Sequence, residues 1–444
     1  MLPYKITTLP TPAGATFSTP TRINKSGTVC GSVSGMNSSS PVIWSPNETV
    51  LPLPQQPNSR ALGLNDNGDV VGVIGLTQPY FWRHGEANYV ALKSLQAGAP
   101  EFFGAANGIN NQGQIVGEVV DPQQTNTNQA VLWDTQFDNP KPLGTEPGLD
   151  YFIGSDANDI NEAGTIVGTY YGPGPGRAAA LWTAGTNQLM LFADRIDNVS
   201  VANAINDAAA PQIVGSFGYG YEYGAEMHAY SYSTGTSQWT DLGTSGVQSV
   251  AYDINNWGDI VGASAGRATV WTAFMSTVRL DDPQISPAYS EGWDLIEARG
   301  INDAGQIVGW GYLNDIQVPR AWMLTPTHSW ISQRIPPAPP WIAQRPIPGP
   351  RGEPLPTGAR SIGEWLLHRY IIRPLFEGGG WHLDAGGKMK PTAIPHVEPM
   401  LKSLNPGLRN VVIAELLGRC SLYLEDQQAR RTLEQLARRL LEER

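Results

Sequence analysis

The feature that most constrains the fold is a short phrase that recurs seven times between residues 23 and 309. It reads INKSGTVCG, LNDNGDVVG, INNQGQIVG, INEAGTIVG, INDAAAPQIVG, INNWGDIVG and INDAGQIVG, in copies that start at Ile23, Leu64, Ile109, Ile160, Ile205, Ile254 and Ile301. Successive copies lie 41, 45, 51, 45, 49 and 47 residues apart. Self-similarity at such a period indicates one supersecondary unit per copy.

Each copy predicts a β-hairpin followed by two further strands. Asn-x-x-Gly is typical of a type I turn closed by a left-handed glycine, and short β-branched runs flank it. A tryptophan phrase follows the hairpin and predicts a third strand; its anchors are Trp44, Trp82, Trp133, Trp182, Trp271 and Trp322, with Tyr230 and Tyr232 in the fifth copy. Segments such as ETVLPL and TVRLDD predict a fourth strand. Four short strands per copy match a propeller blade in size.

We therefore predict an all-β fold over residues 1–334, a seven-bladed β-propeller of four-stranded antiparallel blades. The opening segment YKITTLPTP resembles a fourth strand that lacks the preceding three. We expect the strand around Ile6–Leu9 to complete the blade of the seventh repeat, where it pairs beside Trp330–Ile335 or competes with it.

The remainder of the chain has a different composition. Residues 335–360 are rich in proline and predict a semi-rigid linker. Residues 361–444 predict a small C-terminal α-helical domain, because SIGE at Ser361 is a capping box and Leu433, Leu436 and Leu440 share one helical face.

The repeat resembles the HAF-type extracellular repeat family, whose units carry the signature A-x-x-IN-x-x-G-x-IVG followed by A-x-LW. The resemblance covers about residues 1–330. It implies a propeller-like all-β body and export from the cell, and it implies no catalytic residues. The N-terminal residues lack the apolar core of a secretory leader.

The sequence contains no recognisable catalytic motif, and we predict no catalytic residue, no metal site and no cofactor. His368, His382 and His396 are equally spaced, but by 14 residues, which matches no zinc-ligand spacing. The acids Asp66, Asp207 and Asp303 follow the motif Asn, where calcium binding is an alternative to the turn-forming role that we expect.

The best candidates for partner binding are aromatic side chains in glycine-rich loops. Tyrosine and tryptophan give rigid contact area at low entropic cost. We predict a partner-binding surface that includes Tyr170, Tyr171, Tyr219, Tyr221, Tyr223, Trp257 and Trp293.

The charge distribution argues against nucleic acid as the partner. Residues 1–330 hold 13 Lys and Arg against 29 Asp and Glu, a net charge of −16, which repels phosphates. No run of 18 apolar residues occurs, so we expect no transmembrane helix and a cytoplasmic protein, with leaderless export as an alternative. Two cysteines, Cys30 and Cys420, cannot form a disulfide framework.

These observations favour a non-catalytic recognition or scaffold protein, in which the propeller binds a protein or glycan partner and the helical tail docks another protein. One alternative is a carbohydrate-active enzyme, a lyase or glycosidase, with Asp159 and Asp253 pointing into the central funnel. A buried pair with a raised pKa at the axis would favour that alternative. A third hypothesis is a glycan-binding adhesin.

Overall fold

The computed structural model describes the repeat region with internal gaps. The described residues are 4–35, 38–46, 48–52, 57–75, 77–95, 104–121, 127–144, 154–171, 177–183, 185, 189–191, 198–208, 210–219, 226–243, 246–272, 275–283, 286–314 and 316–326. The predicted linker, the predicted helical domain and Trp330–Ile335 lie outside these ranges. Within them every regular element is a strand, and no helix is long and apolar enough to cross a membrane.

The strands form seven antiparallel sheets of four, one for each repeat. The first sheet contains β2 (Phe17–Ile23), β3 (Val29–Ser34), β4 (Ser39–Ser45) and β5 (Glu48–Pro52). The second contains β6 (Arg60–Leu64), β7 (Val70–Ile74), β8 (Gln78–Trp82) and β9 (Val90–Ala91). The third contains β10 (Gly104–Ile109), β11 (Ile115–Asp121), β12 (Thr127–Trp133) and β13 (Lys141–Pro142). The fourth contains β14 (Gly154–Ile160), β15 (Ile166–Tyr171), β16 (Arg177–Trp182) and β17 (Leu189–Leu191).

The last three sheets follow the same order. The fifth contains β18 (Asn198–Ile205), β19 (Gln212–Tyr219), β20 (Met227–Ser233) and β21 (Gln238–Asp241). The sixth contains β22 (Ser249–Ile254), β23 (Ile260–Ser264), β24 (Arg267–Thr272) and β25 (Met275–Arg279). The seventh contains β26 (Trp293–Ile301), β27 (Ile307–Leu313), β28 (Ile316–Pro326) and β1 (Tyr4–Thr8).

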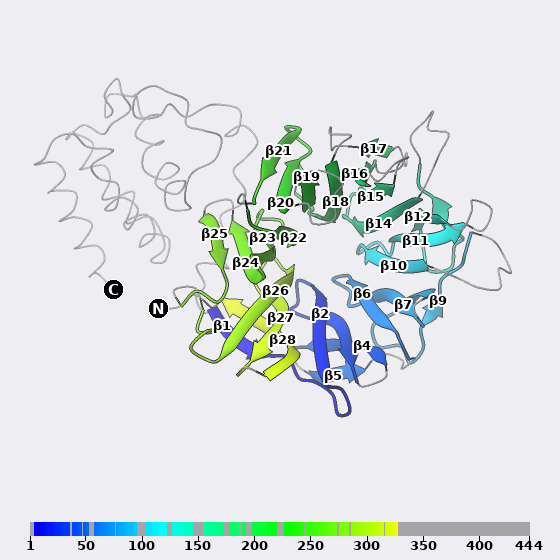
Figure 1. Ribbon diagram of the computed structural model, residues 1–444. Coiled ribbons are helices and arrows are strands. Elements are labelled where there is room, and N and C mark those ends of the chain that lie inside the picture. The colour runs from blue at the N-terminus through cyan, green and yellow to red at the C-terminus, as the bar shows by residue number, and fades with distance from the viewer. Residues whose placement is uncertain are drawn as a thin grey trace, which may run out of the picture. The chain divides into compact units, whose positions relative to one another are not determined.

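The sheets surround an axis as the blades of a propeller (Figure 1). The first strands of neighbouring blades contact one another all the way round, so they form the inner wall of the ring. β1 pairs antiparallel with β28, with Tyr4 opposite Pro326 and Thr8 opposite Trp322. The predicted seven four-stranded blades, and closure of the seventh by the N-terminal strand, are confirmed.

The last glycine of the phrase is required by a β-bulge in the first strand of every blade. In the fourth blade the register of β14 shifts between Ala157 and Asp159. This shift brings the carbonyl oxygen of Asp156 to 1.9 Å from the position that a Cβ on Gly168 would occupy. The equivalent distance in the other six blades is 1.9–2.3 Å, so only glycine fits there.

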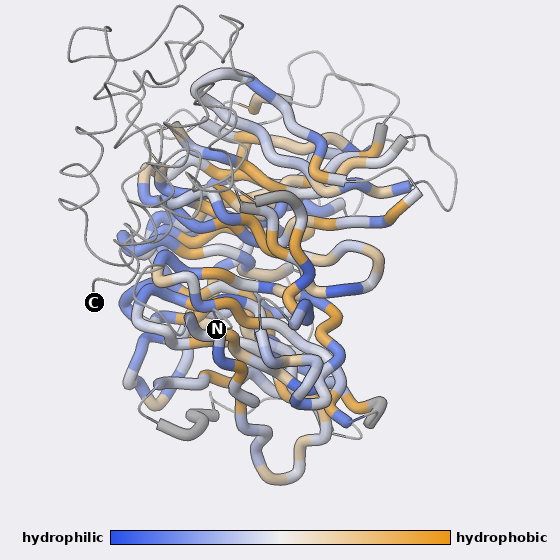
Figure 2. The backbone as a smooth tube through the Cα atoms, turned by 90° about the vertical axis from the view of Figure 1, so that its left-hand side faces the viewer, coloured by the Kyte–Doolittle hydropathy of each residue, from blue (hydrophilic) through white to orange (hydrophobic). Residues whose placement is uncertain are grey.

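The hydrophobic core lies between neighbouring blades, where apolar side chains of adjacent sheets pack together. Figure 2 shows the hydrophobic residues concentrated along the strands. Trp133 and Trp182 are fully buried, and each also bonds to the blade before it. The Trp182 Nε1 donates to the carbonyl of Gly144 at 2.9 Å, and the Trp133 Nε1 donates to that of Lys93 at 3.0 Å. In these two blades the tryptophan therefore ties the blade to its predecessor, because the indole N–H finds its acceptor there.

Candidate functional site

A closed ring of hydrogen bonds encircles the axis at the turns between the first two strands of each blade. The Nδ2 of each motif Asn donates to the backbone carbonyl of the motif Asn in the next blade, at 2.9–3.2 Å. The members of this Asn ring are Asn24, Asn65, Asn110, Asn161, Asn206, Asn255 and Asn302, all buried. The last bond joins Asn302 to Asn24, so the ring is complete.

The Oδ1 of each Asn holds its own turn together. In the fourth blade it accepts the amide of Thr165 at 2.9 Å, and in the fifth the equivalent oxygen of Asn206 accepts the amide of Gln212 at 2.8 Å. One side chain therefore closes the hairpin and links two blades. A buried amide bonded at both ends leaves little capacity for a ligand.

The residue after each Asn forms a second, interrupted ring. Its backbone N–H donates to the side chain at the same position in the next blade, at 2.7–2.9 Å, in six of the seven blades. The acceptors are Asp66, Asn111, Glu162, Asp207, Asn256 and Asp303. The seventh position is Lys25, which has no acceptor atom and instead forms an ion pair with Asp66 at 2.9 Å.

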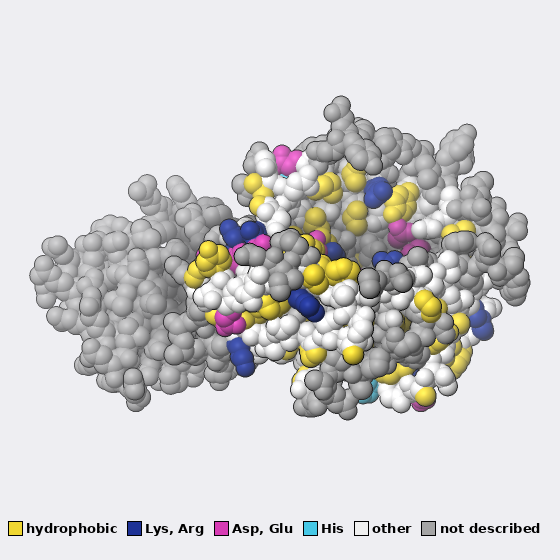
Figure 3. Space-filling view, turned by 60° about the horizontal axis from the view of Figure 1, so that its bottom comes forward, with side chains coloured by type: hydrophobic (Ala, Val, Ile, Leu, Met, Phe, Trp, Pro, Cys, Tyr) yellow, Lys and Arg dark blue, Asp and Glu magenta, His cyan; other side chains and the backbone are white. Residues whose placement is uncertain are grey.

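The two rings surround the mouth of a cavity of about 150 Å³ on the ring axis. Figure 3 shows the molecule hollowed on one face, with hydrophobic, basic and acidic side chains gathered in the hollow. Below the rings lie the residues that precede the motif Ile in each first strand, and the charged ones among them line the cavity. Four of these are small: Gly63, Gly108, Ala204 and Gly300.

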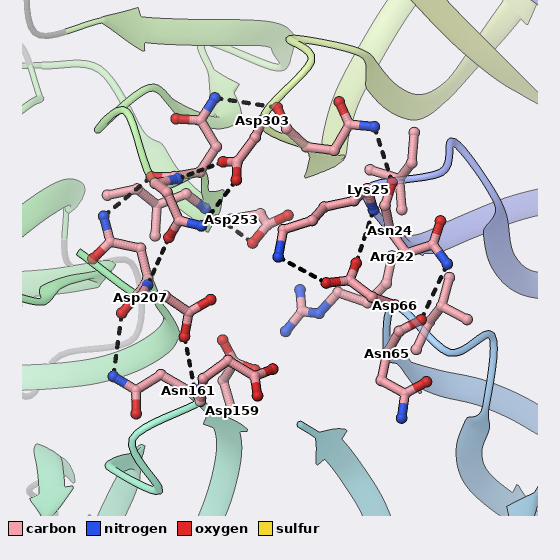
Figure 4. Close-up of a pocket in the computed structure, with 18 of the residues that line it drawn as sticks. Arg22, Asn24, Lys25, Asn65, Asp66, Asp159, Asn161, Asp207, Asp253 and Asp303 are labelled. Atoms are coloured by element: carbon pink, nitrogen blue, oxygen red, sulfur yellow. Dashed lines mark hydrogen bonds and ion pairs between the residues drawn. The ribbon is translucent and has the colours of Figure 1, made fainter. Parts of the chain in front are cut away.

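The other three are charged and differ from blade to blade. Arg22, Asp159 and Asp253 come from the first, fourth and sixth blades and line the same cavity. Figure 4 shows the Arg22 side chain directed toward the space between the two carboxylates. The guanidinium makes no hydrogen bond or ion pair with any residue in the described ranges.

Backbone amides of the next blade position both carboxylates. Asp159 Oδ2 accepts the amide of Ile205 at 3.0 Å, and Asp253 Oδ2 accepts that of Ile301 at 2.9 Å. Asp253 Oδ1 also accepts the amide of Ile254 at 2.9 Å. The two acids thus repeat, in two blades, one geometry that joins neighbouring first strands.

The cavity perturbs the proton equilibria of all three groups. Burial raises the pKa of Asp159 to about 6, and the charge of Asp253 adds to the effect against the opposing pull of Arg22. Burial likewise raises the pKa of Asp253, although Arg22 and the Ile301 amide act in the opposite direction. Burial alone would lower the pKa of Arg22, but the fields of the two acids outweigh it and raise that pKa. The site therefore combines a charged donor with two acceptors, one of which titrates near neutrality.

The turn acids have a role that the sequence did not reveal. Asp66, Asp207 and Asp303 bond to the backbone of the preceding blade, so they do more than shape their own turns. The prediction that Asp159 and Asp253 point inward agrees with their place in the cavity wall. Arg22 was not predicted as a site residue; its signal was a lone cation at a position that is otherwise small or acidic.

Two of the predicted partner-binding residues are wrong, because their side chains are inside the blades. Tyr170 is 2% exposed and Trp293 is 4% exposed, and each packs in a hydrophobic core cluster. Trp257 lies on the turn face and its Nε1 donates to the carbonyl of Asp303 at 3.0 Å. It stays a prediction.

Tyr171 lies in a polar cluster between the third and fourth blades. Its hydroxyl donates to Asp156 Oδ2 at 2.5 Å, and Arg177 lies over its ring at 5.5 Å. Nearby, Asn107 Nδ2 donates to Glu118 Oε2 at 2.5 Å, and burial raises the pKa of Glu118 to about 8. Tyr171 is thus bonded within the protein. The side chain of Tyr219, with Tyr221 and Tyr223, lies outside the described residues.

Comparison with known proteins yields similarity of architecture only. No protein-family model and no curated protein matches the chain. An oligogalacturonate lyase from Vibrio parahaemolyticus aligns over 72% of this chain and 93% of its own, at 12% identity and a TM-score of 0.48. A streptogramin B lyase aligns over 73% and 98%, at 10% identity and 0.42, and TolB from Acinetobacter baumannii over 68% and 80%, at 11% and 0.34. Likeness at this level carries no argument about function.

Proposed function

We propose that this chain is a non-catalytic recognition protein whose propeller binds its ligand in the axial cavity. The observation that supports the proposal is that the polar residues of the first strands and their turns fall into two groups with different contacts. Those repeated in every blade bond to neighbouring blades and build the ring. Those that differ between blades, Arg22, Asp159 and Asp253, line the cavity.

The ring suits recognition because it holds the cavity wall rigid. Each first strand is held by side-chain hydrogen bonds to its neighbours, and backbone amides hold Asp159 and Asp253, so the cavity wall and both carboxylates are in place before a ligand arrives. Preorganisation of this kind lowers the entropic cost of binding. As in the sequence-based hypothesis, we propose that residues 361–444 dock a second protein and that the repeats belong with the HAF-type family.

A second candidate function is a carbohydrate-active enzyme, and one observation favours it. Asp159 has a pKa of about 6 and faces Asp253, whose pKa is also raised. A pair of carboxyls, one of which titrates near neutrality, can serve as acid and base in glycoside cleavage. The same observation fits binding, because protonated and ionised carboxyls are also good hydrogen-bond partners.

One experiment separates these functions. The full chain is mixed with a panel of neutral, acidic and basic small polar compounds and short oligosaccharides, and ligand-observed NMR records both binding and chemical change. Binding without conversion supports recognition, and conversion that is lost in Asp159→Asn supports the enzyme. The matched variants are Arg22→Lys and Arg83→Lys, the latter altering an exposed arginine. If no compound binds, or if Arg22→Lys and Arg83→Lys behave alike, the axial cavity is not the site.

A further inference from the structure

The strongest unexplained feature of the described residues is Arg22, a partly exposed cation that faces the axial cavity and has no hydrogen-bond acceptor among them. The five N–H donors of the Arg22 guanidinium face a cavity in which no described residue accepts them. A guanidinium in that position donates its hydrogen bonds to whatever occupies the cavity, and a ligand that enters must replace solvent as the acceptor.

The carboxylates opposite Arg22 impose the reverse requirement. Each ionised carboxylate has about four acceptor sites. Backbone amides occupy one on Asp159 and two on Asp253 in the bonds described above. The remaining lone pairs need donors. An occupant must therefore accept hydrogen bonds on one side and donate them on the other.

Charge narrows the class of occupant. An anion would satisfy Arg22 but would meet Asp159, Asp253 and the acids of the mouth, which is strongly unfavourable in a confined site. A cation would satisfy the carboxylates but would leave Arg22 without an acceptor. A neutral hydroxyl both donates and accepts, so adjacent hydroxyls on one molecule meet both requirements without a charge penalty.

The volume of the cavity restricts the class of occupant further. The cavity of about 150 Å³ is close to that of an engineered protein cavity, ~150 Å³, that holds a benzene molecule. It therefore accommodates one six-membered ring. Arg22, Asp159 and Asp253 stand in blades one, four and six, so they approach such a ring from three directions around the axis.

We propose that the axial cavity binds a neutral polyol of one ring, such as a single sugar residue or a cyclitol, with Arg22 donating to its hydroxyls and Asp159 and Asp253 accepting from them. This inference rests on the proposed function, since it names the ligand class of the same cavity.

The test uses compounds of one size and three charges. The full chain is titrated with the neutral hexoses glucose, galactose and mannose and with myo-inositol, and in parallel with the cation glucosamine and the anion glucuronate. A maltotriose arm distinguishes a glycan end from a free sugar. At least one neutral compound should bind at least tenfold more tightly than both charged ones, a factor typical of losing a single charged hydrogen bond.

Substitutions of the cavity residues test whether the compound binds in the cavity. Arg22→Lys and Asp253→Asn should each weaken the neutral compound by about tenfold, whereas Arg83→Lys should change its affinity less than about twofold. Circular dichroism checks that each variant is folded; Asp253→Asn keeps the size and shape of the side chain, and Arg22→Lys keeps its charge. Preference for glucosamine or glucuronate, lost in these variants, overturns the polyol inference and leaves the cavity as a binding site. Binding that none of the cavity variants affects overturns both proposals.

Discussion

The Asn ring makes a strong prediction about stability, which Asn161→Ala tests. Asn161 is 3% exposed and forms two bonds that alanine cannot replace. Its Nδ2 donates to the carbonyl of Asn206 at 3.2 Å, and its Oδ1 accepts the amide of Thr165 at 2.9 Å. The substitution leaves one carbonyl and one amide without these partners.

The magnitude follows from those two groups. A buried polar group that loses its partner costs about 1–3 kcal/mol. The bond to the Asn206 carbonyl is buried and the bond from the Thr165 amide is only partly buried, so we expect a total loss of about 3 kcal/mol, below the upper limit for two groups. Unfolding entropy of about 2 cal/mol/K per residue gives ~0.7 kcal/mol/K for a propeller of this size. The loss therefore corresponds to a fall in Tm of roughly 4–5 °C.

Equilibrium urea denaturation followed by tryptophan fluorescence and by circular dichroism measures the change. The matched control is Asn67→Ala, which removes an exposed asparagine whose Nδ2 donates to the carbonyl of Asn111 at 3.1 Å on the same face. We expect the control to lose less than about 0.5 kcal/mol. If Asn161→Ala is no more destabilising than Asn67→Ala, the ring of side-chain bonds does not stabilise the fold.

Three further predictions concern single groups in the blades. Burial raises the pKa of Glu118 from 4.5 to about 8, so the protein loses stability as the pH rises between those values and the side chain ionises. In urea titrations, Glu118→Gln should therefore stabilise the protein by a few kcal/mol at pH 9 and leave its stability unchanged at pH 4. The pKa of His228 is raised: burial opposes its charge, but hydrogen bonds to Glu226 and Asp241 outweigh this. The charged His228 therefore stabilises the fold below pH 6.5, and this stabilisation is lost as the pH rises through the pKa of His228 in the folded protein. His228→Gln should lower the Tm more at pH 5.5 than at pH 9. Gly168→Ala places a Cβ 1.9 Å from a carbonyl oxygen of β14, and we expect a loss of more than about 2 kcal/mol or failure to fold, measured by calorimetry; a Tm within 1 °C of the unchanged protein would contradict the account of the bulge.

The sequence was sufficient to predict the architecture because every blade carries the same local signals. The turn phrase marks the first hairpin, the tryptophan phrase marks the third strand, and the seven copies give the number of blades. Closure was predictable because Tyr4–Thr8 reads as a strand with no preceding hairpin, and it pairs with β28.

The inner wall could not be derived in the same way. The Asn161 side chain bonds to a carbonyl 45 residues away, and such a partner follows from ring geometry and not from local pattern. Arg22 meets Asp159 and Asp253 only because blades one, four and six face one axis. By contrast, the burial of Tyr170 had a local signal: it lies in the second strand of its blade, which has a strand on either side, and residues 166–170 are all buried.

Hydrogen exchange of the turn amides tests the central claim most directly. The claim is that hydrogen bonds from the repeated polar residues join the seven turns into one ring. The amides that bond to the Oδ1 of the motif Asn, such as those of Gln114, Thr165, Gln212 and Gln306, should exchange as slowly as amides in the inner strands. Exchange at the rate of unstructured loops would show that the turns open independently and that the ring does not hold.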